Sequence, residues 1–467
     1  MNHPPPLDLL TNIPGISWPA IPAKGPAMVL AVLYQLELSQ WSSPDVLQQQ
    51  QLQQLAGLVE HAYRLAPFYR RRFDSLGFKP CEQLTEDQWA RIPILRRQDV
   101  QEAGDELNSS TPPAGHGPTQ VSVTSGSTGR PVSVLKTQAA GFFWRIFTVR
   151  EHLWHQRDFS QKLGVIRVIK QKDLPESGVQ TRNWGSATAG LFRTGLACAL
   201  NIHRPIKDQA EWLMQHQPGY LLSYPSNILA LTRYFAERQW KLSGLKEVRT
   251  FGELLDPAVR KACRDVWAVD VKDVYSSQEV GYVALQCPEC DAYHVQSEGV
   301  RVEILDPDDR PCEPGEVGRV IVTPLHNFAT PLIRYEIGDF AQVGQPCACG
   351  RGLPVLKRII GRQRNMLILP DGRRIWPSVA DAELLEKLVP DMPPIQQFQY
   401  IQRSMTELEL KMVVPQRLTE AQERGLRQYV QKIFFHPFNV ILTYTEAIPC
   451  GPTGKYEDFR CEVEDVV

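Results

Sequence analysis

The densest group of chemically useful residues in the chain is a short loop that begins at Thr124. It combines small hydroxylated residues, two glycines and an arginine: Thr124, Ser125, Gly126, Ser127, Thr128, Gly129 and Arg130. Glycine lets the backbone turn tightly and present amide donors, while the hydroxyls and the guanidinium add further donors and positive charge. Phosphate is the natural ligand of such a loop. It is not a Walker loop, because the Gly-x4-Gly-Lys-Ser/Thr spacing is missing and a strand, not a helix, is expected to follow. Taken alone, the loop would be interpreted as a solvated turn.

Four cysteines form a second group with possible chemistry. Cys287 and Cys290 are one closely spaced pair, and Cys347 and Cys349 are another. Four thiolates would complete a closed, tetrahedral structural zinc site, with His294 as the substitute ligand if one cysteine does not reach. The gap between the pairs exceeds the usual zinc-ribbon spacing, so reduced, unliganded thiols remain the alternative.

Composition and charge exclude several partner classes. The chain has 467 residues, with 51 Lys and Arg against 52 Asp and Glu, for a formal net charge of −1. The charges are interspersed, so no basic tract is present to bind nucleic acid or an anionic membrane. The longest apolar stretch, 28–34, is far shorter than the roughly 20 residues of a membrane span. We therefore expect a cytoplasmic protein without nucleic-acid or membrane partners, and a homodimer is compatible with the sequence.

Periodicity predicts an α/β protein with three parts. An extended, proline-rich N-terminal arm is expected over 1–42. A large domain is expected over 43–361, because β-rich runs alternate with amphipathic helices between 120 and 285, which is typical of mostly parallel sheets flanked by helices. A β-rich subdomain with antiparallel strands is expected over about 285–361. A small α+β domain is expected over 362–467, with a hairpin near Asp371, a helix over 419–434 and a strand over 405–414.

Several motifs occur in an order that resembles one known superfamily. The loop at Thr124 is similar to the phosphate loop of the adenylate-forming superfamily of acyl-CoA synthetases and nonribosomal peptide adenylation domains. Within it, the likeness is to the phenylacetate–CoA ligase group with its CapK-type members. The further matches are Phe251-Gly252-Glu253, Tyr275-Ser276-Ser277-Gln278-Glu279, Arg334-Tyr335-Glu336-Ile337-Gly338-Asp339, Gly361-Arg362 and Gly451-Pro452-Thr453-Gly454-Lys455. Five matches in the superfamily's order are not expected by coincidence.

The resemblance implies a role for each matching residue. Gly252 and Glu253 would line the adenine pocket, and Tyr275 would stack on adenine within the motif that also holds Ser276 and Gln278. Glu279 would hold magnesium against the phosphates, Asp339 would bind the ribose hydroxyls, and Arg362 would lie near the ribose. Lys455 would be the catalytic lysine on a mobile C-terminal domain, with Arg364 as the hinge residue.

The sequence departs from the family pattern at four of these positions. Gln278 replaces the usual Thr or Ser, Ser276 replaces Gly, and Arg130 replaces a frequent lysine. An amide still hydrogen-bonds a phosphate, and arginine is a bidentate donor, so the chemistry tolerates these changes. Arg364 stands where the likeness puts an Asp or Lys hinge, so how the hinge rotates is open.

The acid-binding pocket is expected, by the same likeness, at Tyr224 and at the small-residue loop containing Trp184 and Gly185. Such a slot suits an aromatic or otherwise flat acid. The alternative is that Trp184 is a core residue and the glycines form turns.

Together these features predict an ATP-dependent enzyme that activates a carboxylic acid as an acyl-adenylate and transfers the acyl group to CoA. The implied cofactors are ATP, Mg²⁺, CoA and a structural Zn²⁺. Transfer to a carrier-protein thiol or an amine instead of CoA is one alternative. A catalytically inactive nucleotide-binding relative is another, although Lys455, Glu279 and Asp339 are all present.

Overall fold

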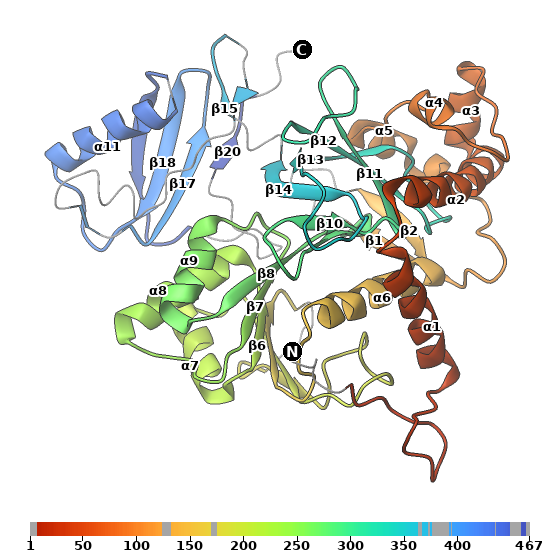
Figure 1. Cartoon of the computed structure of the whole chain (residues 1–467). Helices are drawn as coiled ribbons and strands as arrows, with labels where there is room; N and C mark the ends of the chain where they lie inside the picture. Colours follow the sequence, from red (N-terminus) through yellow and green to blue (C-terminus); the bar gives the residue numbers. More distant parts are fainter. Residues whose placement is uncertain are drawn as a thin grey trace. The chain divides into compact units, whose positions relative to one another are not determined.

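The structure is a computed structural model, and its elements are drawn in Figure 1. It describes residues 7–123, 132–169, 175–362, 367–371, 374–375, 392–393, 395–434, 436–448 and 459–463. The chain divides into two compact units, Met1–Ile360 and Gly361–Val467. Each unit is described by itself.

The helices of the first unit carry the amphipathic and capping patterns expected of them. Ser43, for example, accepts a hydrogen bond from the Val46 amide and precedes a proline at the first helical position, which is a favourable helix start. The helices are α1 (Lys24–Ser39), α2 (Pro44–Leu65), α3 (Pro67–Ser75), α4 (Glu86–Ala90), α5 (Arg97–Ala103), α6 (Gln138–Trp154), α7 (Ile206–His216), α8 (Pro225–Arg238) and α9 (Pro257–Trp267), with a 3₁₀ turn at Gly104–Leu107.

The N-terminal segment differs from the extended arm expected over 1–42. Residues 24–39 form helix α1, so that prediction is wrong for this range. The only proline of the helix, Pro26, lies in its first turn, where a missing amide breaks no helical hydrogen bond. Val29, Leu33 and Leu36 are buried on one face of the helix, and this packing stabilises it.

One mixed sheet is the centre of the first unit. Its order is β11-β12-β13-β14-β10-β9-β8-β7-β6-β3-β5-β4. The strands are β3 (Leu163–Arg167), β4 (Val179–Thr181), β5 (Ala197–Asn201), β6 (Tyr220–Ser223), β7 (Glu247–Phe251), β8 (Asp270–Ser277), β9 (Gly281–Gln286), β10 (Tyr293–Val295), β11 (Val300–Leu305), β12 (Val317–Pro324), β13 (Tyr335–Val343) and β14 (Val355–Arg362). The run β5-β3-β6-β7-β8 is parallel, as the alternation of strands and helices predicts.

Helices cover both faces of the parallel strands. Helices α7, α8 and α9 lie together on one side, and α6 lies on the other, next to α1 (Figure 1). Neighbouring residues of one strand enter different cores: Leu221 packs with the α7–α9 helices, and Tyr220 packs with α1 and α6. Because successive strand side chains point to opposite faces, strands covered on both faces have near-continuous apolar sequences.

In the segment where antiparallel β structure is expected, strands β11, β12 and β13 pair antiparallel in succession. This confirms the prediction of antiparallel strands. The segment does not form a sheet of its own. Strands β9 and β10 run antiparallel to their neighbours and join it to the parallel strands. The predicted parallel sheet and β-rich subdomain are therefore two halves of one sheet.

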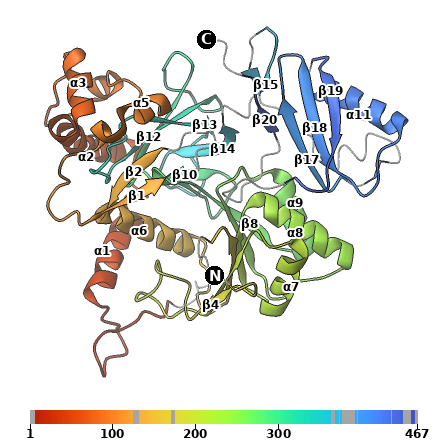
Figure 2. The ribbon, with the colours of Figure 1, turned by 180° about the vertical axis from the view of Figure 1, so that it is seen from behind.

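A separate hairpin frames the predicted phosphate loop. Strands β1 (Thr119–Val123) and β2 (Ser133–Thr137) pair antiparallel (Figure 2). Val123 lies opposite Ser133 at the end of the hairpin that adjoins the loop. The strand expected after the loop is thus confirmed. The loop itself, 124–131, lies outside the described residues.

The second unit contains a four-stranded sheet of order β19-β18-β17-β20. Its elements are β15 (Leu367–Ile368), β16 (Arg374–Ile375), β17 (Gln397–Gln402), β18 (Glu407–Val413), α11 (Glu420–Ile433), β19 (Asn439–Tyr444) and β20 (Phe459–Cys461). The predicted strand over 405–414, the helix over 419–434 and the hairpin near Asp371 are confirmed. Within the described ranges, no helix combines the length and the hydropathy that a membrane span requires.

Candidate active site and cysteine cluster

The predicted nucleotide-binding motifs follow adjacent parallel strands. Strands β6, β7 and β8 are neighbours in the sheet. Tyr224 follows the end of β6, Gly252 and Glu253 follow the end of β7, and Tyr275 lies near the end of β8. Carboxyl ends of parallel strands meet at one edge of a sheet, where α/β proteins usually bind ligands. The fold therefore brings these motifs together at one edge.

A buried hydrogen bond joins two of the predicted nucleotide contacts. The hydroxyl of Tyr275 donates to the Asp339 carboxylate at 2.8 Å. Both side chains are 8% exposed, and they come from strands β8 and β13, which are not neighbours in the sheet. A hydroxyl donor orients a carboxylate and leaves its other lone pairs for further donors, such as ribose hydroxyls.

The hairpin that frames the phosphate loop is attached to the same edge. The hydroxyl of Ser122 in β1 donates to the backbone carbonyl of Gln278 at 3.1 Å. Ser276 and Gln278 lie in the segment that leads into Glu279, whose side chain is 5% exposed. The contact places the base of the predicted phosphate loop next to the carboxylate predicted to hold magnesium.

Glu253 has a structural contact that the sequence did not reveal. Its carboxylate accepts hydrogen bonds from the backbone amide and the hydroxyl of Ser226, at 3.0 and 3.1 Å. Ser226 lies in the first turn of α8, and a carboxylate such as that of Glu253 is favoured there by the helix dipole. The rings of Tyr224 and Phe251 lie 4.7 Å apart. The predicted acid segment at Tyr224 and the predicted adenine segment at Glu253 are therefore in direct contact.

Trp184 is placed in the core, which is the alternative interpretation of this residue. Its ring packs against His152, Phe159 and Tyr220, with centroids 5.2 to 5.4 Å apart. Its indole N–H donates to the carbonyl of Gln161 at 2.8 Å. Tyr220 begins β6, so Trp184 lies toward the opposite end of that strand from Tyr224. Its ring is packed among other aromatic side chains, which favours the core interpretation, and the substrate contact by Trp184 stays a prediction.

The loop around Gly185 is held by a residue that no motif indicated. Gly185 has a φ of +101°, which favours glycine. Arg145 in α6 donates to the carbonyls of Ala187 and Ala189, at 3.0 and 2.8 Å. Only the packing of α6 against this loop identifies Arg145. The substrate role of Gly185 stays a prediction.

Several predicted site residues lie outside the described residues. They are the phosphate loop Thr124–Arg130, the hinge residue Arg364 and the catalytic residue Lys455. Arg362 is the last residue of β14. Their predicted roles stay predictions.

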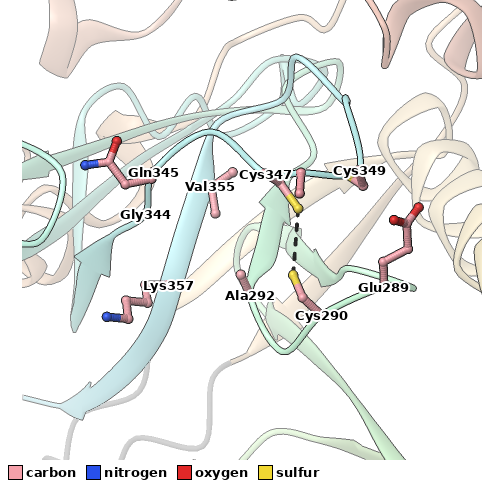
Figure 3. Close-up of a pocket in the computed structure, with 10 residues that line it drawn as sticks. Glu289, Cys290, Ala292, Gly344, Gln345, Cys347, Cys349, Val355 and Lys357 are labelled. Carbon is pink, nitrogen blue, oxygen red and sulfur yellow. Dashed lines mark hydrogen bonds between the residues drawn. The ribbon is translucent and has the colours of Figure 1, made fainter.

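The cysteine pairs, 57 or more residues apart in the chain, meet in the structure. The Cys347 sulfur lies 3.8 Å from that of Cys287 and 3.7 Å from that of Cys290. The Cys349 sulfur lies 3.3 Å from Nε2 of His294. Figure 3 shows Cys290 and Cys347 pointing toward one another from two different loops, beside a pocket of about 320 Å³.

These distances fit a tetrahedral metal site. Two thiolates bound to one zinc at about 2.3 Å are roughly 3.8 Å apart. The ligand atoms of Cys287, His294, Cys347 and Cys349 all lie within 4.8 Å of one another, and Cys290 is an exposed fifth donor beside Cys347. Burial lowers the pKa of His294 to about 4, so its imidazole is neutral at pH 7, as a metal ligand must be.

Comparisons with known proteins agree with the motifs. The CapK C-terminal domain family matches residues 378–459. Phenylacetate-coenzyme A ligase of Escherichia coli (strain K12) is 28% identical over 353 residues, which cover 74% of this chain and 77% of that protein. The ligase of the same name from Pseudomonas putida is 24% identical, and the match covers 92% of this chain and 96% of that protein.

A solved structure shows the same fold. The crystal structure of 2-hydroxyisobutyryl-CoA ligase in the postadenylation state matches with a TM-score of 0.67 and 21% identity, covering 88% of this chain and 89% of that one. The order of the motifs, the meeting of Tyr275 with Asp339 and these matches point to the same group of proteins. Over most of its length the chain is similar in sequence to the phenylacetate–CoA ligases, over 378–459 it matches the CapK C-terminal domain, and its fold is that of an adenylate-forming ligase.

Proposed function

We propose that the protein activates a carboxylic acid of aromatic or arylacetic type with ATP and transfers the acyl group to CoA. The observation that carries this proposal is the buried hydrogen bond between Tyr275 and Asp339. It joins the predicted adenine contact to the predicted ribose contact at the edge where Gly252 and Glu279 also lie. The names of the two phenylacetate-coenzyme A ligases support the choice of acid and acceptor.

The proposed reaction has two steps. In the first, a carboxylate oxygen of the acid attacks the α-phosphorus of ATP, the bond to pyrophosphate breaks, and an acyl-adenylate forms. In the second, the CoA thiolate attacks the acyl carbon and AMP leaves. Negative charge on the phosphates opposes the first step, and preorganised positive charge lowers this barrier.

The chain supplies groups for each part of this site. The loop Thr124–Arg130 would bind the phosphates, Lys455 would approach the α-phosphate, and Asp339 would hold the ribose. Magnesium bound by Glu279 would neutralise charge on the phosphate oxygens. A lysine on a second unit can be delivered for the first step and withdrawn for the second, with a backbone rotation at Arg364.

We also propose that the cysteine cluster holds one structural zinc ion. The ligands with mutually suitable distances are Cys287, His294, Cys347 and Cys349, and Cys290 is the alternative to His294. Four protein ligands close the coordination sphere, so the ion would stabilise the fold and take no part in the reaction.

Trapping of the activated acid as a hydroxamate tests the proposed function. The enzyme is supplied with ATP, Mg²⁺, hydroxylamine and a panel of carboxylic acids, with and without CoA. Acid-dependent hydroxamate, together with a thioester when CoA is present, is the expected result. Adenylation without a CoA product would indicate a carrier-protein thiol or an amine as acceptor. No adenylation of any acid, with ATP still bound, would indicate an inactive relative.

A further inference from the structure

Lys136 is a charged residue of the first unit to which no motif assigns a role. It lies in β2, two residues before helix α6 begins. Side chains alternate along a strand, so Lys136 and Val134 share one face. Val134 is 1% exposed and belongs to the buried cluster that also contains Tyr275 and Val283. Lys136 therefore lies on the side of the hairpin that faces strands β8 and β9.

The ammonium group of Lys136 is half-buried, and the charge of Glu279 lies near it. Among the residues that the structure describes, none forms a hydrogen bond or an ion pair with it. Burial lowers the pKa of Lys136 to about 8, and the nearby charge of Glu279 acts in the opposite direction. The group therefore still carries most of its charge at pH 7. An ammonium removed from water without a partner is unfavourable, so the site favours a bound anion.

The position of Lys136 along the hairpin separates it from the phosphate loop. Ser133, opposite Val123, is the first strand residue after the loop, and Lys136 pairs with Gln120 three residues further along. At about 3.3 Å per residue, this is roughly 10 Å from the base of the loop. The backbone of Lys136 is thus displaced from the base of the loop toward the start of α6.

The first turns of α6 carry an exposed surface, part of which lies beside the segment that follows Glu279. A Cβ added to Gly141 would meet no atom within 4 Å. One turn later, Trp144 is 42% exposed, and its ring centroid lies 4.6 Å from that of Tyr282. A Cβ on Gly281 would lie 3.8 Å from the Trp144 ring. A flat group can pack against this surface, which consists of a glycine inside a helix, an exposed tryptophan and a glycine on the facing strand.

From these placements we propose that Lys136 binds a second anionic group on the acid that the enzyme activates, so that the substrate class is carboxylic acids bearing another carboxylate or a comparable anion. The reacting carboxylate would lie next to the magnesium held by Glu279, and the acyl part would extend along Gly141 and Trp144. This inference rests on the proposed function. It makes Lys136 a specificity-determining residue.

The test compares size-matched pairs of acids in pyrophosphate exchange. Suitable pairs are 4-carboxyphenylacetate with 4-methylphenylacetate, and glutarate with pentanoate. Lys136→Met keeps the chain length but removes the charge. It should lower kcat/KM for the dicarboxylates by about 10- to 100-fold, the range for a charged hydrogen bond, mainly through KM. The neutral acids should change by less than about twofold, and wild-type enzyme should prefer the dicarboxylate of each pair.

Two further variants sharpen the comparison. Lys207→Met removes an exposed lysine of α7 and should behave as wild type for every acid. Lys136→Glu should reverse the preference toward an acid with an amine, such as 4-(aminomethyl)phenylacetate. The proposal would be overturned if Lys136→Met lowered kcat/KM equally for both members of each pair. It would also be overturned if the variant raised the KM for ATP with no change in acid preference. The second result would assign Lys136 to the phosphates.

A binding measurement separates this proposal from the proposed function. The thermal midpoint Tm is followed with each acid alone, without turnover. Dicarboxylates should raise the Tm of the wild type and of Lys207→Met, but not of Lys136→Met. If the wild type adenylates no acid while this pattern holds, the proposed function fails and the Lys136 site stands. If adenylation occurs but Tm and kinetics do not distinguish the pairs, the Lys136 proposal fails alone.

Discussion

The hydroxyl of Tyr275 donates a hydrogen bond to the carboxylate of Asp339, across 64 positions of sequence and between two strands that are not adjacent in the sheet. Both side chains are buried, so water at the protein surface does not replace this hydrogen bond. A carboxylate held in this way is oriented before a ligand arrives, which reduces the entropy lost on binding.

Removal of the Asp339 carboxylate should therefore weaken nucleotide binding selectively. Asp339→Ala is expected to raise the KM for ATP by about 10- to 100-fold, the range for hydrogen bonds to a charged group. Tyr275→Phe keeps the ring and removes only the orienting hydroxyl, so its effect should be smaller. Pyrophosphate exchange at varied ATP measures both. An unchanged KM for ATP in Asp339→Ala would exclude the ribose role, and Tyr34→Phe, at an exposed tyrosine, is the control.

Lys455→Ala should lower acyl-adenylate formation by on the order of 100-fold or more, while ATP binding changes little. The physical reason is the loss of positive charge where negative charge develops on the α-phosphate. Pyrophosphate release reports the rate, and a direct ATP titration reports binding. Lys432→Ala, at an exposed lysine of α11, should leave both unchanged. Normal pyrophosphate release from Lys455→Ala would exclude the proposed role.

Purified protein should contain about one zinc ion per chain, measured by elemental analysis of samples prepared without chelator. Cys347→Ser should lose the ion and lower the stability of the first unit, because Cys347 contacts both Cys287 and Cys290. Cys81→Ser, at a cysteine outside the cluster, should retain it. Protein free of zinc under these conditions would rule out the metal site.

The identity of the fourth ligand can be tested separately. His294→Ala should lose zinc and Cys290→Ser should retain it, because His294 belongs to the mutually close group and Cys290 is exposed. The reverse result would identify the site as four cysteines.

Arg364→Pro should affect the two half-reactions unequally. Proline fixes φ at the predicted pivot, so one pose of the C-terminal unit should be favoured over the other. Adenylation is measured by pyrophosphate exchange, and thioester formation by supplying the acyl-adenylate. Arg364→Ala leaves φ free and should retain both activities. Equal loss of both activities in Arg364→Pro would indicate misfolding, and no loss would place the pivot elsewhere.

A buried ionic network should make the stability of the first unit depend on pH. Glu151 is 1% exposed and pairs with Arg157 and Arg249. Burial alone would raise the pKa of Glu151, but the two guanidinium groups hold it well below its usual value. Because the folded pKa is the lower one, this stabilisation is present above about pH 4.3, the unfolded value, and is lost as the pH falls toward the folded pKa.

Glu151→Gln should therefore lower the free energy of unfolding at pH 7 by about 3–5 kcal/mol, since it removes the buried charge that pairs with Arg249 and leaves Arg157 with Glu247 as its carboxylate. It should also flatten the loss of stability below about pH 4.3. Glu211→Gln, in an exposed pair with Lys207, should change stability by less than about 0.5 kcal/mol. Urea unfolding at several pH values measures both variants. An unchanged acid profile in Glu151→Gln would show that other carboxylates control it.

Local patterns in the sequence determined the elements and the order of the motifs. The parallel strands, the hairpin around the phosphate loop and helix α11 follow from periodicity and turn residues, which act over a few positions. The spacing of the cysteines also predicted that Cys347 meets Cys287. The order of the motifs predicted the family that the chain resembles. The secondary-structure elements depend on residues near one another in sequence. The cysteine pairing and the family depend on combinations of residue types that have few other uses in proteins.

Tertiary structure decided which of these residues meet. Trp184 matched a substrate loop by resemblance, yet its ring is enclosed by aromatic side chains from three other segments. Helix α1 forms where prolines suggested an extended arm, because Val29 and its neighbours on one face are buried by the rest of the unit. The meeting of the Lys136 ammonium with the charge of Glu279 has no local signature in the sequence. Such contacts depend on packing between distant segments, which single-residue propensities do not encode.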